Sequence, residues 1–246
     1  MAGELAAQRL GLAALAQVLP PDRVESALTS CGRVAQRVRT LPPWVTTYHV
    51  LVSAMYPSMG YDEVTALLWP TLPAATGRSL ALQRPSRGAI TRARLRIGVD
   101  PLECLLRDLL GSRLPAASAE RVYLQKLTGP GTPIWWIGDG GSVGLLGCDV
   151  RGGDAGAAVD LVNRVAAQIV VVCPPHDDTS LQVRERLGAA IAVEVGEPPE
   201  GPVSTWAGLR ARSSATWAQD ALARACVTVA AELALSASRV AGDPRS

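Results

Sequence analysis

Residues 85 to 111 of this 246-residue chain read PSRGAITRARLRIGVDPLECLLRDLLG and contain two amphipathic helical patterns in succession. The spacing predicts a first helix from Ser86, a good N-cap residue, to about Ile97, with Gly98 as its C-cap. Its inward-facing residues lie three or four positions apart, at Ile90, Ala93 and Ile97. Pro101 opens the second helix, whose apolar side is formed by Leu102, Leu105, Leu106, Leu109 and Leu110. This stretch therefore predicts helices that pack on a common core.

The first of these helices is strongly basic. Its four arginines fall outside the apolar face, so we expect them to be exposed, and no acidic residue occurs between Arg84 and Asp100. A face of this kind neutralises phosphates, and arginine also pairs with guanine edges in the major groove. The residues expected to contact double-stranded DNA are Arg84, Ser86, Arg87, Thr91, Arg92, Arg94 and Arg96. The alternative is a solvated face, because 23 arginines against one lysine also fit GC-rich codon use.

Prolines divide the preceding residues into short helices. We expect helices over about 4–18, 22–30, 44–56 and 61–68, followed by a loop over 70–84. His49 lies among apolar residues of the third helix, where a packed core histidine is a better interpretation than a ligand. Residues 1–112 thus form the first expected domain, a helical bundle of the DNA-binding type.

After residue 112 the pattern changes to short apolar runs rich in Val, Ile and Trp. These predict strands at 133–138, 142–150, 168–173 and 189–195, with helices at 154–167, 179–188 and 214–240. A glycine-rich turn would join the first two strands as a hairpin, and the later crossovers are long enough to contain helices, which favours parallel pairing. The expected fold class is α + α/β. A small α/β domain over 121–246, with a mostly parallel sheet and a long C-terminal helix, would follow the helical bundle.

The two halves of the chain differ in charge. Residues 1–126 contain fourteen Arg and one Lys against nine acids, a net +6, whereas residues 127–246 contain nine Arg against thirteen acids, a net −4. The overall +2 hides this difference. The first half is therefore the one expected to bind a polyanion such as DNA.

Other sequence features bear on location and partners. No apolar run approaches the roughly 18 residues that cross a bilayer, and Glu4 argues against a signal peptide, so we expect a cytoplasmic protein without a membrane partner. Five cysteines, an odd number without two-residue spacing, indicate core thiols in a reducing compartment and no metal site. Small residues on the last helix could pack on the sheet or on a second copy, and a homodimer is expected.

Landmarks of a known family run through the first half in a fixed order. They are Leu41, Pro42, Pro43, Tyr48, Tyr56, Pro57, Gly60, Tyr61, Glu63, Val64, Pro85, Ser86, Ala89, Ala93, Arg94, Leu95, Gly98, Pro101 and Leu102. With these landmarks, residues 4–112 resemble the N-terminal domain of bacterial transposases of the insertion-sequence-four type. The resemblance implies a helical module that helps to recognise DNA ends.

The same resemblance implies a ribonuclease-H-like catalytic half that holds metal ions on three carboxylates. Here Asp139 and Asp177 follow apolar runs, but the downstream Tyr-Arg-Glu-Lys signature of the family is missing. The preferred hypothesis is a non-catalytic DNA-binding protein, such as a transcriptional regulator, without a cofactor. One alternative is a divergent or truncated transposase that uses Asp139, Asp177 and Glu194 with magnesium. Another is a protein-protein interaction scaffold that has lost contact with DNA.

A ligand site in the α/β domain is a further possibility. If the strands at 142–150 and 168–173 are parallel neighbours, their carboxyl ends meet at one edge of the sheet. The candidate ligand-binding residues there are Asp149, Arg151, Asp154, His176, Asp177 and Asp178. The competing interpretation is structural, with Asp154 and Thr179 as helix N-caps and His176 as an ordinary loop histidine.

Overall fold

The computed structural model describes residues 11–33, 41–80, 83–112, 121–138, 145–150, 152–165, 170–173, 178–188, 193–196 and 213–241. The chain divides into two compact units. The helical unit consists of Leu5–Leu109 and Leu222–Ser246, and the sheet unit consists chiefly of Leu110–Ala221. The predicted domains are 1–112 and 121–246. A domain in this sense folds by itself, so these boundaries stay a prediction. In the division by contacts, Leu222–Ser246 belongs to the same unit as the N-terminal helices.

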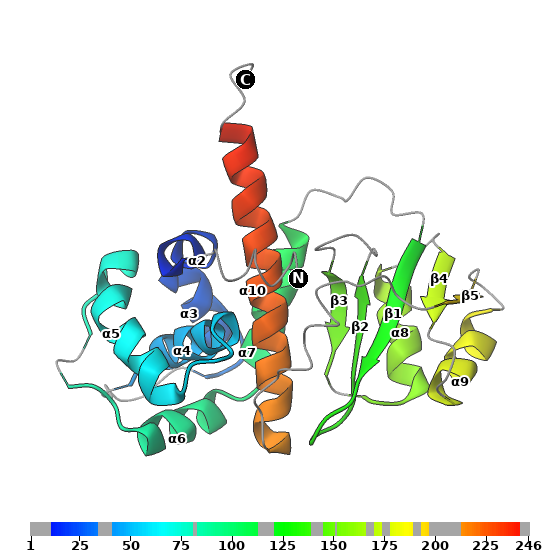
Figure 1. Cartoon of the computed structure of the whole chain (residues 1–246), viewed down its shortest axis with the longest axis horizontal. Helices are drawn as coiled ribbons and strands as arrows, with labels where there is room; N and C mark the ends of the chain where they lie inside the picture. Colours follow the sequence, from blue (N-terminus) through cyan, green and yellow to red (C-terminus); the bar gives the residue numbers. More distant parts are fainter. Residues whose placement is uncertain are drawn as a thin grey trace. The chain divides into compact units, whose positions relative to one another are not determined.

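Six helices precede the sheet in the described residues, and Figure 1 shows them in blue to green. They are α2 (Leu12–Val18), α3 (Pro21–Ser30), α4 (Pro43–Met55), α5 (Tyr61–Thr76), α6 (Arg87–Ile97) and α7 (Asp100–Gly111). Both α3 and α4 begin at a proline, where the missing N–H costs no helical hydrogen bond. Eleven of the thirteen residues of α4 are buried, so this helix forms the centre of the unit.

Helix α5 is longer than the sequence pattern indicates. The expected helix ended at residue 68 before a loop, but α5 continues through Pro70 and Pro73 to Thr76. Two threonine hydroxyls donate to carbonyls one turn back, Thr71 to Leu67 O and Thr76 to Leu72 O, both at 2.7 Å. Burial of Trp69 and Leu72 stabilises the extra turns, and Gly77 ends the helix at φ +67°.

The long helix α10 (Ser214–Ala241) supplies residues to both units. In the sheet unit, its Trp217 indole donates to Thr132 O at 3.1 Å and lies against Gly129 and Gly131. In the helical unit, Arg224 donates to Ala54 O of α4 at 2.7 Å, and Cys226 donates to Leu102 O of α7 at 3.5 Å.

The expectation that no apolar run is long enough to cross a bilayer was wrong. Within the described residues, Thr216–Ser238 has the length and, with a hydropathy of 1.4, the composition of a spanning helix. The most apolar window of that stretch is 61% buried inside the protein, and core helices pass the same test. Arg224, only 4% exposed, is bound to a backbone carbonyl, which is the behaviour of a helix packed within a protein.

The sheet unit contains a five-stranded mixed sheet in the order β3-β2-β1-β4-β5. Its strands are β1 (Arg121–Leu127), β2 (Ile134–Gly138), β3 (Leu145–Asp149), β4 (Val170–Cys173) and β5 (Val193–Val195). Strand β2 is antiparallel to β1 and β3, whereas β4 is parallel to β1 and β5. The α + α/β class and the β2–β3 hairpin are thus confirmed. The sheet is mixed, because β2 runs against the other four strands.

Strand β1 is the element that the sequence analysis missed. It occupies the centre of the sheet, between β2 and β4. Helices α8 (Ala155–Val165) and α9 (Asp178–Leu187) pack side by side on one face of the sheet (Figure 1). The apolar core of this layer includes Val122, Leu124, Trp135, Ala158, Leu161, Val171, Val183 and Leu187.

Candidate nucleic-acid interface

Helix α6 has the boundaries and caps that its sequence predicts. The Ser86 hydroxyl accepts a hydrogen bond from the Ala89 backbone N–H at 3.3 Å, which caps the first turn. At the other end Gly98 adopts φ +68°, a conformation that favours glycine. Ile90, Ala93 and Ile97 are buried, and the helix packs on α4 and α5. The opposite surface of α6 is thereby left to solvent.

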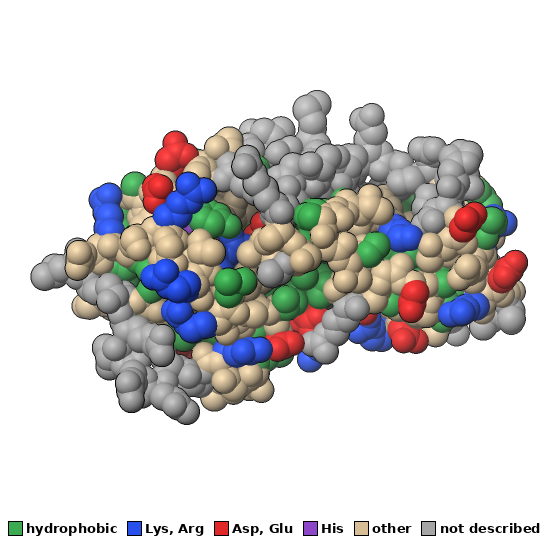
Figure 2. Space-filling model, turned by 90° about the horizontal axis from the view of Figure 1, so that it is seen from below, with side chains coloured by type: hydrophobic (Ala, Val, Ile, Leu, Met, Phe, Trp, Pro, Cys, Tyr) green, Lys and Arg blue, Asp and Glu red, His purple; other side chains and the backbone are tan. Residues whose placement is uncertain are grey.

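This outer surface carries the predicted basic residues. The exposed ones are Arg84, Ser86, Arg87, Thr91, Arg92 and Arg96. Within the described ranges, the side chains of its four arginines form no ion pair. Figure 2 shows basic side chains gathered on this side of the helical unit. Leu95, which was not among the predicted residues, is 52% exposed on the same helix.

Arg94 departs from the expected exposed position. Its side chain is only 1% exposed and lies inside the helical unit. The guanidinium carbon lies 5.1 Å from the centre of the Tyr61 ring, and Nη1 donates to the Tyr61 hydroxyl. The reason is helical spacing, because residue 94 is four positions after Ile90 and three before Ile97 and so shares their inward face. Arg94 therefore supports the interface from within.

A hollow of about 460 Å³ opens beside the start of α6. Its lining residues are Leu41, Gln83, Arg84, Pro85, Ser86, Ala89, Arg92 and Arg96. Three of these described residues are arginines, and none of them is acidic. The first turn of a helix adds backbone N–H groups and the positive end of the helix dipole. The hollow therefore has the chemistry of a site for a phosphate or another oxyanion.

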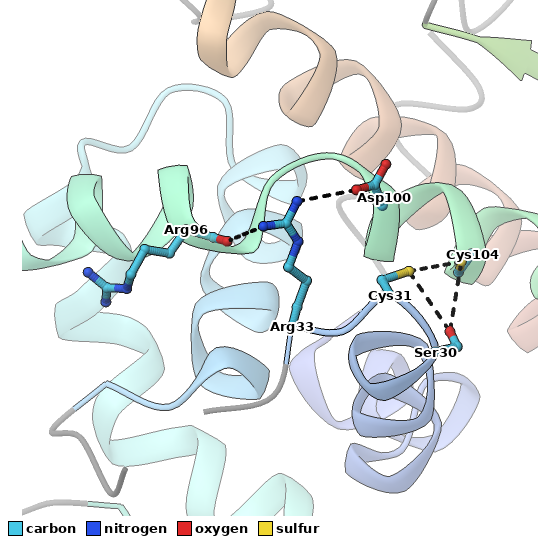
Figure 3. Close-up of polar contacts among 6 residues, drawn as sticks. All are labelled: Ser30, Cys31, Arg33, Arg96, Asp100 and Cys104. Atoms are coloured by element: carbon cyan, nitrogen blue, oxygen red, sulfur yellow. Dashed lines mark hydrogen bonds and ion pairs between the residues drawn. The ribbon is translucent and has the colours of Figure 1, made fainter. Parts of the chain in front are cut away.

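Arg33 holds the turn between α6 and α7, a role that sequence analysis did not find. Its Nη1 donates to Arg96 O at 3.4 Å, and its Nη2 pairs with the Asp100 carboxylate at 3.3 Å (Figure 3). The Arg96 side chain points away from this contact (Figure 3). Arg33 thus fixes the backbone at the end of α6 and leaves the Arg96 guanidinium available to solvent.

His49 lies in the core next to the aromatic partner of Arg94. Its Nε2 lies 3.2 Å from the Thr65 hydroxyl, and its ring meets the edge of Tyr61 at 5.6 Å between centroids. The ring is 2% exposed, which confirms the expected core histidine. Burial lowers the pKa of His49 to about 4, and the nearby charge of Arg94 acts in the same direction. The imidazole is therefore neutral at physiological pH.

The ligand site predicted for the edge of the sheet rested on an assumption about strand order that was wrong. The prediction assumed that β3 and β4 are neighbours, but β2 and β1 separate them, so the strands lie about 14 Å apart. Asp149 pairs with Arg164 at 2.9 Å, and Asp154 caps α8 by accepting from Ala157 N at 2.9 Å. Asp178 is the first residue of α9. Arg151, His176 and Asp177 lie outside the described residues.

The carboxylates of the transposase alternative are also not brought together in the described part of the chain. Asp139 and Asp177 lie outside it, and Glu194 is an exposed residue of the short strand β5. Among the residues that the structure describes, no three His, Cys, Asp or Glu side chains are grouped as metal ligands would be.

The helical unit therefore presents a capped, basic helix on its surface. A family model described as insertion element 4 transposase N-terminal matches residues 9–107. The match confirms the resemblance seen in the sequence and covers α6, the helix of the candidate interface. The rest of the chain matches no family model. Comparisons with curated proteins and with solved structures gave no match.

Proposed function

We propose that the helical unit binds double-stranded DNA through the outer surface of α6. The observation that carries the proposal is the hollow at the capped start of α6, where Arg84, Arg92 and Arg96 are lining residues and the described lining contains no acidic side chain. The family match supports it, since the matched family is that of transposase N-terminal domains. In this proposal Arg87, Thr91 and Ser86 extend the contact along the phosphate backbone.

Electrostatics explain why these arginines favour DNA. Each guanidinium that contacts a phosphate releases condensed counterions, so affinity falls as salt rises. Because the four exposed arginines have no ion pair in the described residues, binding breaks no internal salt bridge. Four phosphate contacts correspond to a slope of about −3.6 in a plot of log affinity against log salt concentration.

The proposed role is non-catalytic and requires no cofactor, as in a transcriptional regulator. A cytoplasmic location and a homodimer are parts of the same proposal, since paired modules read paired DNA half-sites. Light scattering of the whole protein tests the dimer. A mass of one chain at working concentration argues against it.

The decisive experiment is a salt titration of duplex binding by the full chain. We expect the double variant Arg92→Ala/Arg96→Ala to bind about 10- to 100-fold more weakly than the wild type, with a salt slope shallower by about 2. The matched control is Arg107→Ala/Arg186→Ala, which removes the same charge from exposed positions outside the α6 face. The control should retain more of the affinity and of the slope.

Equal affinity for the two double variants would contradict the proposal. Magnesium-dependent nicking that Asp139→Asn abolishes would instead favour the divergent transposase. Indifference to DNA, combined with a stoichiometric protein partner, would favour the scaffold.

A further inference from the structure

Two cysteines far apart in the sequence meet in the helical unit. Cys31 is the C-cap residue of α3, and Cys104 lies on α7. Their Sγ atoms are 3.2 Å apart although 73 positions separate them in the chain (Figure 3). Both thiols are free and partly exposed, so a small reagent in solvent has access to them.

The pair is placed so that a bond needs only a small movement. A disulfide has an S–S length of about 2.05 Å, so the sulfurs need to approach by about 1.2 Å. Cys31 has the freedom for this, because it follows the last turn of α3 and precedes Gly32, which adopts φ +65°. The Ser30 hydroxyl lies 3.9 Å from the Cys31 sulfur and 4.0 Å from the Cys104 sulfur.

We propose that Cys31 and Cys104 form a reversible intramolecular disulfide when the protein meets hydrogen peroxide. The thiolate of one cysteine attacks a peroxide oxygen, the O–O bond breaks, and a sulfenic acid forms while the other oxygen leaves as water. The second thiol then attacks the sulfenic sulfur, and a second water leaves. The two thiols lose two electrons in total, and hydrogen peroxide is reduced to two waters.

The surroundings of Cys31 slow the reaction of its thiol with oxidants. Burial raises the pKa of the Cys31 thiol, and the contact with Cys104 and, more weakly, the nearby Asp100 carboxylate act in the same direction, whereas the Ser30 hydroxyl lowers this pKa. The thiol is therefore protonated at neutral pH, where the reactive thiolate is scarce. Cys173 and Cys226 are buried, so they are shielded from reagents in solvent.

The disulfide would stabilise the part of the molecule that positions α6. Arg33, two residues after Cys31, contacts the end of α6 and the start of α7. A bond between Cys31 and Cys104 would join α3 to α7 beside this contact (Figure 3). Because the bond closes a long loop, it removes conformational freedom from the unfolded chain, and we expect the Tm of the helical unit to rise by about 5–10 °C.

Peptide mapping of the full chain after exposure to hydrogen peroxide tests the proposal. Trypsin releases residues 24–33 and 97–107, each with one cysteine, and we expect these peptides to be linked under non-reducing conditions. Two of the five thiols should become resistant to alkylation, and a dithiol reductant should restore them. The Cys104→Ser variant should lose the link and the rise in Tm, whereas the Cys148→Ser variant should retain both.

Separate alkylation of the two peptides after peroxide would overturn the proposal. So would a link between two copies of the chain, or irreversible sulfinic acid at either position. The map is read from the wild-type protein, so it does not depend on whether the variants fold. It is also independent of DNA binding, since the linked peptide forms or fails to form without DNA.

Discussion

At the scale of single residues, the helical unit stabilises uncharged and charged groups by different means. The Tyr61 ring and hydroxyl lie against the guanidinium of Arg94 in the core. His49 contacts the same Tyr61 ring. Its imidazole is neutral because it is buried and because the charge of Arg94 is nearby. The polar core under α6 therefore holds a guanidinium close to an imidazole that resists protonation.

This resistance predicts a pH dependence of folding. In the unfolded chain His49 has the ordinary histidine pKa of 6.5, and in the folded protein its pKa is about 4. The unfolded state therefore binds more protons between these values, and the free energy of unfolding falls by about 3 kcal/mol as pH drops from 6.5 to 4. Urea unfolding of the wild type across this range measures the fall.

The His49→Gln variant isolates the contribution of the imidazole. Glutamine does not titrate, so the variant should lose stability less steeply between pH 6.5 and pH 4 than the wild type. If the free energy of unfolding falls equally with pH in the two proteins, protonation of His49 does not destabilise the folded state.

At the scale of helices and strands, the end of α6 depends on one glycine. Gly98 adopts φ +68°, and a Cβ at this position would lie 3.3 Å from Arg33 Nη2. We expect Gly98→Ala to lower the free energy of unfolding by about 1–2 kcal/mol. Chemical denaturation of the purified variant measures this loss.

Gly88→Ala is the matched control, because it makes the same substitution within the first turn of the same helix. The added Cβ would lie 3.4 Å from the flexible end of Arg92, and alanine favours the helix. We expect this variant to gain up to about 1 kcal/mol. Equal destabilisation by both substitutions would show that the positive φ of Gly98 does not cause the loss in the free energy of unfolding.

Sequence patterns predict those elements whose local signals agree with their tertiary surroundings. Helix α6 has a serine cap, a regular apolar face and a terminal glycine, and all three are confirmed. Helix α5 runs past two prolines because burial of Trp69 and Leu72 outweighs their cost, which no local pattern reveals. Strand β1 does carry a signal, since Val122 and Leu124 alternate with more polar residues.

The candidate interface was predictable in part for the same reason. The arginines at 84, 87, 92 and 96 are exposed as expected, whereas Arg94 is buried because its position in the helical repeat matters more than its charge. The contacts of Arg33 join segments more than 60 residues apart, so only the tertiary structure brings them together. The assumption that β3 and β4 are neighbours was wrong, because the order of strands in a sheet does not have to follow their order in the sequence.

At the scale of the whole molecule, α10 makes the two units depend on one element. Residues from Leu222 to Ala231 are all buried, and Arg224 and Cys226 bind backbone carbonyls of α4 and α7. We therefore expect a fragment of residues 1–112 to lack a cooperative thermal unfolding transition, because the surface that α10 covers is apolar. Circular dichroism during heating measures the transition.

A second fragment serves as the control for this prediction. Residues 1–112 joined to residues 222–241 by a flexible linker restore the missing helix, and cooperative unfolding should return. A sharp transition for residues 1–112 alone would instead favour the predicted domain boundary at 112.

The place of α10 in the chain also has a consequence during protein synthesis. Residues 222–241 leave the ribosome more than a hundred residues after α7 has emerged. Until then α4 and α7 lack their contacts with α10. During that interval the nascent helices are candidates for chaperones. A messenger RNA truncated before codon 222 would yield chains whose apolar helices stay uncovered. Proteases would degrade these chains faster than the full-length protein.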